Sequence, residues 1–68
     1  MKRETLKQSE LIQSIGWNLN KMEVKYRGDG AVFVYFDVPF TTFHALQRGK
    51  HPGEDWLQIR DQYSYKRV

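Results

Sequence analysis

Residues 22–27 constrain the fold of this chain most strongly, because apolar and charged side chains alternate there without exception. The apolar side of the alternation comprises Met22, Val24 and Tyr26, and the charged side comprises Glu23, Lys25 and Arg27. A period of two is typical of a β-strand with one buried and one solvated face. Gly-Asp-Gly follows at 28–30, and glycine adopts the positive φ of hairpin turns without steric cost. The sequence therefore predicts a strand at 22–27 that leads into a hairpin.

Two further segments fit an antiparallel arrangement around this strand. Before it, Ile15, Trp17 and Leu19 alternate with small or polar residues, and the asparagines within 18–21 favour a turn. After it, residues 31–37 are apolar on both faces, which is typical of a strand covered on both sides. Such a strand needs a second neighbour, and we expect the closing segment YSYKRV at 63–68 to supply it.

The residues after the predicted sheet favour two helices. Apolar side chains recur at steps of three and four from Phe40 to Leu46, which predicts an amphipathic helix over 40–48. Pro39 fits its first turn, and Gly49 stands where a C-cap glycine belongs. A second, shorter helix is expected over 54–61, with two acidic residues at its start to favour the helix dipole. The predicted class is α+β: a small antiparallel three- to four-stranded β-meander, with one main and one short helix packed on one face.

A chain of 68 residues has room for one domain. Residues 1–10 are polar and show no sustained period, so we expect an N-terminal lead that is disordered or loosely helical, followed by one domain over 11–68. The chain has no cysteine, which excludes disulfides and thiolate ligands. The core must therefore come from other side chains, above all the aromatic residues, which make up 15% of the chain.

Charge and hydropathy bear on where the protein is located and on whether it binds nucleic acid or a membrane. The cations and anions are interleaved and sum to +3, which describes a solvated surface more than a cationic track for nucleic acid. The longest apolar run, at 31–36, is far too short to span a bilayer, and no apolar run follows the N-terminal charges as in a signal peptide. We expect a cytoplasmic protein without membrane association.

The titratable residues do not form a recognisable catalytic or metal-binding set. His44 falls within the first predicted helix and His51 in the turn before the second. Together with Glu54 and Asp55 they lack the further ligands that a tetrahedral zinc site requires. The two acids are explained by the helix dipole, and no phosphate-binding or nucleophile motif is present. We therefore expect no enzymatic activity, no catalytic residue, no metal site and no cofactor.

Aromatic side chains interleaved with cations remain as a candidate binding surface. Tyr63 and Tyr65 share one face of the closing segment, and aromatic rings on a sheet can stack nucleobases. The alternative is that these tyrosines pack within the domain and that arginines stack on them. The sequence does not show whether Tyr63 and Tyr65 lie in the core or on the surface. The candidate surface comprises Lys25, Arg27, Arg60, Tyr63, Tyr65 and Arg67.

A set of short motifs occurs in a characteristic order. They are Ile15-Gly16-Trp17, the hairpin glycines, Phe33-x-Tyr35, Val38-Pro39, Phe43-x-x-Leu46, Ile59-Arg60 and Tyr63-Ser64-Tyr65-x-Arg67-Val68. The ordered set, over residues 11–68, resembles the KTSC domain, which is named after the C-terminus of some lysyl-tRNA synthetases. The family also occurs as free-standing small proteins in bacteria and phages. The resemblance implies a compact β-meander with helices.

The resemblance and the lack of catalytic motifs favour a non-catalytic binding or adaptor module. We expect it to act through protein–protein interaction, with an unidentified protein or a second copy of the chain as its partner. The alternative is a module that binds RNA or single-stranded DNA. The synthetase context would link such a module to translation, and the phage occurrence would link it to phage biology.

Overall fold

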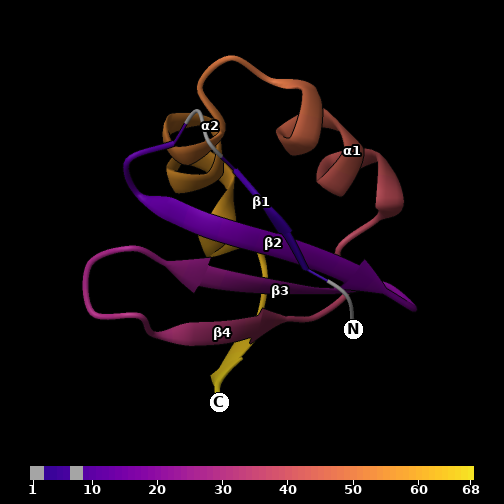
Figure 1. The fold of residues 1–68 in the computed structure, drawn as a ribbon. Coiled ribbons are helices and arrows are strands. Elements are labelled where there is room, and N and C mark those ends of the chain that lie inside the picture. Colours follow the sequence, from indigo (N-terminus) through magenta and orange to yellow (C-terminus); the bar gives the residue numbers. More distant parts are fainter. Residues whose placement is uncertain (1–2, 7–8) are drawn as a thin grey trace.

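The computed structural model describes residues 3–6 and 9–68 (Figure 1). The elements in chain order are β1 (Arg3–Thr5), β2 (Ile12–Asn18), β3 (Lys21–Tyr26), β4 (Val32–Tyr35), α1 (Phe40–Arg48), α2 (Pro52–Ile59), the short 3₁₀ helix η1 (Arg60–Gln62) and β5 (Tyr65–Arg67). Figure 1 shows both α-helices on one side of the sheet and β5 at its lower edge. The predicted α+β class, with an antiparallel meander and helices on one face, is confirmed.

The sheet formed by the described residues has five strands, and their spatial order follows the chain. This is one strand more than the upper end of the predicted range of three to four. The additional strand is β1, in which Arg3 lies opposite Gly16 and Thr5 lies opposite Ser14. Three residues are too few to display an alternation, so the sequence did not reveal this strand. For Arg3–Thr5 the expectation of a disordered or loosely helical lead was wrong, while positions 1–2 and 7–8 of that lead lie outside the described residues.

The closing segment pairs with β4, as predicted. Tyr65 lies opposite Tyr35, and Arg67 lies opposite Phe33. The backbone N–H of Phe36 donates to the carbonyl of Ser64 at 2.9 Å, which extends the pairing beyond the strand itself. YSYKRV is therefore part of the sheet and not a tail.

Both predicted turns are present. Leu19 and Asn20 join β2 to β3 with φ angles of 50° and 62°, the geometry of a two-residue hairpin loop. Leu19 is consequently 79% exposed and does not extend the apolar side of β2. Between β3 and β4, the carboxylate of Asp29 accepts a hydrogen bond from the Ala31 N–H at 2.9 Å. These turns determine the register that brings the apolar sides of the strands to one face.

Helix α1 spans the predicted residues 40–48 and Gly49 is its C-cap residue, but the conformations at its two ends differ from the expectation, as does the start of α2. Pro39 precedes α1 in an extended conformation instead of lying in its first turn. Gly49 is also extended, with φ −70° and ψ 152°, so it is not the left-handed cap that helix ends often use. Helix α2 begins at Pro52, two residues earlier than predicted, because proline suits the first helical position. It ends at Ile59, where the chain tightens into η1.

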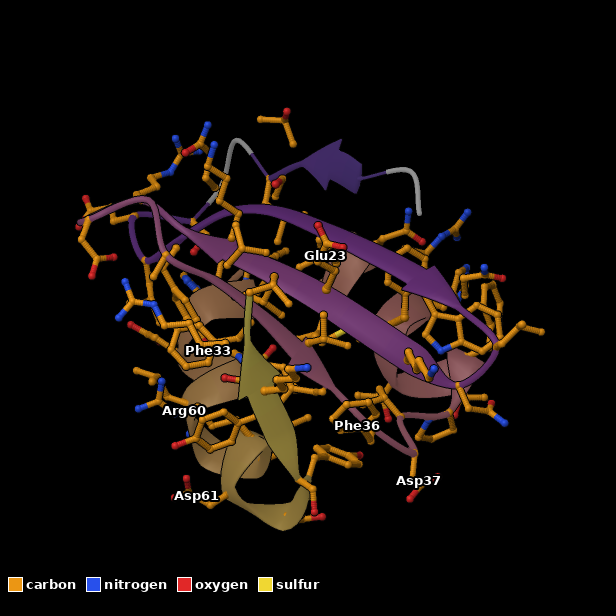
Figure 2. The ribbon with its side chains drawn as sticks, turned by 90° about the horizontal axis from the view of Figure 1, so that it is seen from below. Glu23, Phe33, Phe36, Asp37, Arg60 and Asp61 are labelled. Atoms are coloured by element: carbon orange, nitrogen blue, oxygen red, sulfur yellow. The ribbon has the colours of Figure 1, made fainter. Side chains whose placement is uncertain are left out.

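The core lies between the helices and the sheet. Trp56 of α2 is the largest fully buried side chain, and its ring meets Tyr35 edge-on at 4.7 Å between centroids. The buried cluster comprises Leu6, Ile12, Ile15, Met22, Val24, Tyr35, Val38, Phe43, Leu46 and Trp56. Glu23 lies on the opposite face of the sheet, as Figure 2 shows from below.

Gly53 allows α2 to lie close against the segment after β1. A Cβ atom at this position would be 2.6 Å from Ser9 Oγ and 3.2 Å from Leu11 Cβ. The Ser9 hydroxyl cannot move away freely, because it accepts a hydrogen bond from the Ile12 N–H at 2.9 Å. The missing side chain at Gly53 is therefore required by packing.

We expect Gly53→Ala to lower the free energy of unfolding by up to roughly 2 kcal/mol in urea denaturation. Overpacking costs about 1–3 kcal/mol, and the higher helix propensity of alanine offsets about 1 kcal/mol. Gly28→Ala is the matched control, since a Cβ at Gly28 meets nothing within 4 Å. Its effect should stay within about 0.5 kcal/mol. Equal losses in the two variants would contradict the packing role of Gly53.

Candidate binding site

A hydrogen-bonded network forms where α2 and η1 meet the sheet. The indole Nε1–H of Trp56 donates to the Tyr26 hydroxyl at 3.0 Å, and the hydroxyls of Tyr26 and Tyr35 are hydrogen-bonded at 2.7 Å. The Arg60 guanidinium interacts electrostatically with both tyrosines. We call these four residues the tyrosine network. They come from β3, β4, α2 and η1, so the network joins the helical layer to the sheet.

The direction of one hydrogen bond in this network is fixed by chemistry. The indole of Trp56 can only donate, so the Tyr26 oxygen accepts from it. In the bond between Tyr26 and Tyr35, either hydroxyl can be the donor. When Tyr26 donates, the O–H of Tyr35 is left for another acceptor.

Burial dominates the proton chemistry of Tyr35. It raises the pKa of the phenol well above the ordinary 10.0, and the hydrogen bond with Tyr26 raises it further, against the opposing effects of the Arg60 charge and the Trp56 indole. The interaction with Tyr26 likewise raises the pKa of the Arg60 guanidinium. Near neutral pH, Tyr35 is thus a neutral O–H donor beside a permanent cation.

A pocket of about 270 Å³ opens beside the tyrosine network. The ring of Tyr65 lies 5.4 Å from Phe33 and 5.6 Å from Tyr35, between centroids, and forms one wall. Figure 2 shows Phe33, Arg60 and Asp61 on the same side of the molecule. We call this cavity the aromatic pocket. Its lining residues are Tyr26, Phe33, Tyr35, Arg60, Asp61 and Tyr65.

Three of the six candidate residues from the sequence lie at the aromatic pocket. Arg60 and Tyr65 line it, and Tyr65 is 60% exposed. The Arg67 guanidinium lies over the ring of Phe33, 6.0 Å from its centroid. Tyr63 is different, because it is half-buried and stacks on Trp56 at 5.9 Å with 11° between the planes. Of the two tyrosines, Tyr63 packs on the core and Tyr65 lies at the surface.

The remaining two candidates lie apart from the pocket. Lys25 alternates with Val24 and Tyr26 in β3, so it is directed to the face away from the helices. Arg27 donates from Nε to the Ser9 carbonyl and from Nη2 to the Leu6 carbonyl, each at 2.8 Å. Arg27 therefore anchors the segment that follows β1, and these two cations do not extend the surface around the pocket.

The pocket includes four residues that were not in the predicted surface: Tyr26, Phe33, Tyr35 and Asp61. The sequence analysis placed Tyr26 on the apolar side of a strand, and it placed Phe33 and Tyr35 within a strand that is apolar on both faces. For Phe33 and Tyr35, the sequence contained one signal, which is the expected pairing of 63–68 with 31–37. Residues opposite each other on neighbouring strands share a face, so this pairing places the two rings on the same face as Tyr65 and Arg67. Asp61 has no comparable signal, because its place depends on how η1 continues from α2.

The histidines lie elsewhere. His44 stacks on the ring of Phe40 at 5.8 Å between centroids, and His51 lines a separate hollow with Ser9 and Glu54. Within residues 3–6 and 9–68, no three histidine, cysteine or carboxylate side chains gather as metal ligands would. In the same part of the chain, no helix is long and apolar enough to cross a membrane. The cytoplasmic location stays a prediction.

Fold and pocket together define a small α+β domain, in which a meander closed by its C-terminal strand carries an aromatic cavity. The family model of the KTSC domain matches residues 8–65, and the chain belongs to this family. It is similar to the crystal structure of KTSC domain protein YPO2434 from Yersinia pestis. The TM-score is 0.88 and the sequence identity 21%, over 98% of this chain and 96% of that chain. Among curated proteins, none matches the chain significantly.

The raised pKa of Tyr35 predicts a loss of stability in alkaline solution. The phenol of the unfolded chain ionises near pH 10, whereas the folded phenol keeps its proton, so the free energy of unfolding falls as the pH rises above about 10. This single group contributes a slope of about 1.4 kcal/mol per pH unit. Urea denaturation across this range should show a steeper decline for the wild type than for Tyr35→Phe. An equal decline in the wild type and in Tyr35→Phe would show that burial does not keep the Tyr35 phenol protonated in alkaline solution.

Proposed function

We propose that this KTSC domain is a non-catalytic binding module whose aromatic pocket holds one acidic side chain of a partner protein. A single observation carries the proposal: aromatic walls, a permanent cation and a neutral phenol hydroxyl occur in one cavity. Phe33 and Tyr65 provide the walls, and the donors belong to Arg60 and Tyr35.

The size of the pocket favours a side chain over a free small molecule. Sites for drug-sized ligands typically enclose about 300–1,000 Å³, and this cavity of about 270 Å³ lies below that range. The rings of Phe33 and Tyr65 suit the methylene groups of a glutamate. Its carboxylate could accept hydrogen bonds from Arg60 and Tyr35, and such charge-assisted bonds are about twice as strong as neutral ones.

The balance of charge around the pocket also favours an anion. Asp61 lines the pocket and interacts favourably with Arg60, so it offsets part of that positive charge. Arg67 adds a second cation beside Phe33. Two cations against one exposed carboxylate leave a net positive charge for an incoming acidic group.

The groups in the pocket suit recognition better than turnover. General acid–base catalysis works best with a group whose pKa lies near the working pH. The pKa of Tyr35 and that of Arg60 are both raised, away from neutrality. We therefore assign these residues to ligand binding.

A second candidate function is the binding of single-stranded nucleic acid, which the exposed ring of Tyr65 next to Lys66 and Arg67 favours. An aromatic ring flanked by cations can stack a base while the cations contact phosphates. We prefer a protein partner, because Arg27 is committed to the Leu6 and Ser9 carbonyls and does not extend this surface. Oligonucleotide binding that weakens steeply with salt would reverse this preference.

Selection of displayed random peptides on the purified protein tests the proposal. We expect the enriched peptides to share a glutamate or aspartate. Their affinity should fall about 10-fold or more in Arg60→Gln, because a hydrogen bond to a charged group contributes about 1.5–3 kcal/mol. Arg48→Gln is the matched control, since Arg48 is exposed in the last turn of α1. It should bind the selected peptides like the wild type.

A second variant separates the pocket from general charge attraction. Tyr35→Phe keeps the ring and the charge but removes the O–H donor, and we expect affinity to fall about 3- to 10-fold. Peptides that share no acidic residue would contradict the proposal. So would equal losses in Arg60→Gln and Arg48→Gln.

A further inference from the structure

The hydrogen-bond pattern of β5 shows which of its backbone groups face away from the sheet. Ser64 accepts from the Phe36 N–H, and the Val68 N–H donates to Val32, each at 2.9 Å. In an antiparallel pair, the residues that exchange hydrogen bonds alternate with residues that do not. Residues 64, 66 and 68 therefore bond toward β4. The N–H and C=O groups of Tyr65 and Arg67 point to the other side.

That other side is open. Among the strands of the described residues, β5 is the last in the sheet, and its three residues are all exposed. Figure 1 shows the strand at the rim of the molecule, with its end directed away from the helices. An edge with outward N–H and C=O groups is a template on which a further strand can pair.

We propose that an extended, acidic segment of a partner protein pairs with the free edge of β5 as a sixth strand. The inference deepens the proposed function and rests on it for the protein nature of the partner. Backbone hydrogen bonds to Tyr65 and Arg67 supply the pairing, and the cations Lys66 and Arg67 select acidic side chains on the incoming strand.

The same charges oppose self-association. A second copy of the chain, paired through β5, would bring Lys66 and Arg67 of both copies together, and like charges across strands are destabilising. An acidic segment meets no such repulsion. Its side chains next to Tyr65 and Arg67 would also lie on the face of the sheet that carries the aromatic pocket.

Amide shifts in an NMR titration with synthetic peptides test this pairing. The probe is the blocked peptide Ac-VEVEVE-NH₂. One control is Ac-VKVKVK-NH₂, and another is the glutamate peptide with both central residues N-methylated, which blocks pairing along either edge. We expect the glutamate peptide to shift the amides of β5 and Val68 most strongly. Both controls should bind at least about 10-fold more weakly, since the lysine peptide reverses the charge and N-methylation removes backbone donors.

Lys66→Glu provides a charge-swap variant, and its amide spectrum reports whether it is folded. It should weaken binding of the glutamate peptide and strengthen binding of the lysine peptide. Equal binding of the N-methylated and unmethylated peptides would overturn the inference, as would shifts confined to regions away from β5. A β5-dependent dimer in size-exclusion chromatography, or an oligonucleotide that shifts β5 while the glutamate peptide does not, would also overturn it.

The two proposals fail in different ways. If the glutamate peptide shifts β5 but its affinity is the same in Arg60→Gln, strand pairing stands and the pocket assignment is wrong. If peptides selected on the protein depend on Arg60 yet leave the β5 amides unshifted, the pocket stands and strand pairing is wrong.

Discussion

Trp56 joins the two layers of this domain. Its ring is fully buried, meets Tyr35 edge-on at 4.7 Å and stacks on Tyr63 at 5.9 Å. A buried indole N–H needs an acceptor, because an unpaired buried donor costs about 1–3 kcal/mol. The Tyr26 hydroxyl supplies that acceptor from within the sheet. Helix α2 consequently cannot slide along the sheet without losing both the packing and the hydrogen bond.

The candidate site is a consequence of this anchoring. Trp56 donates to the Tyr26 hydroxyl, which is hydrogen-bonded to that of Tyr35, so both phenol groups are held in place beside the pocket. Polar groups held in this way need little ordering when a partner binds, which lowers the entropic cost of association. Tyr65 and β5 are exposed at the rim, where a partner can reach them.

The sequence predicted those features that arise from short-range patterns. Alternation over 22–27 and the Gly-Asp-Gly turn defined a hairpin, and the apolar strand at 31–37 indicated that 63–68 pairs beside it. Strand β1 was missed because three residues carry no periodicity. The sequence also could not show that Tyr63 is half-buried while Tyr65 is exposed. Both fall on one face by alternation, but Tyr63 precedes β5 and meets Trp56, a contact set by the path of η1.

Hydrogen exchange of the indole N–H of Trp56 tests most directly whether this residue holds the layers together. The chain has two tryptophans, so the two indole signals can be followed separately. We expect the Trp56 indole to exchange only on global unfolding, as slowly as the most protected amides of β3, and we expect Tyr26→Phe to remove this protection. Fast exchange of the Trp56 indole while the β3 amides stay protected would contradict it, because α2 would then separate from an intact sheet.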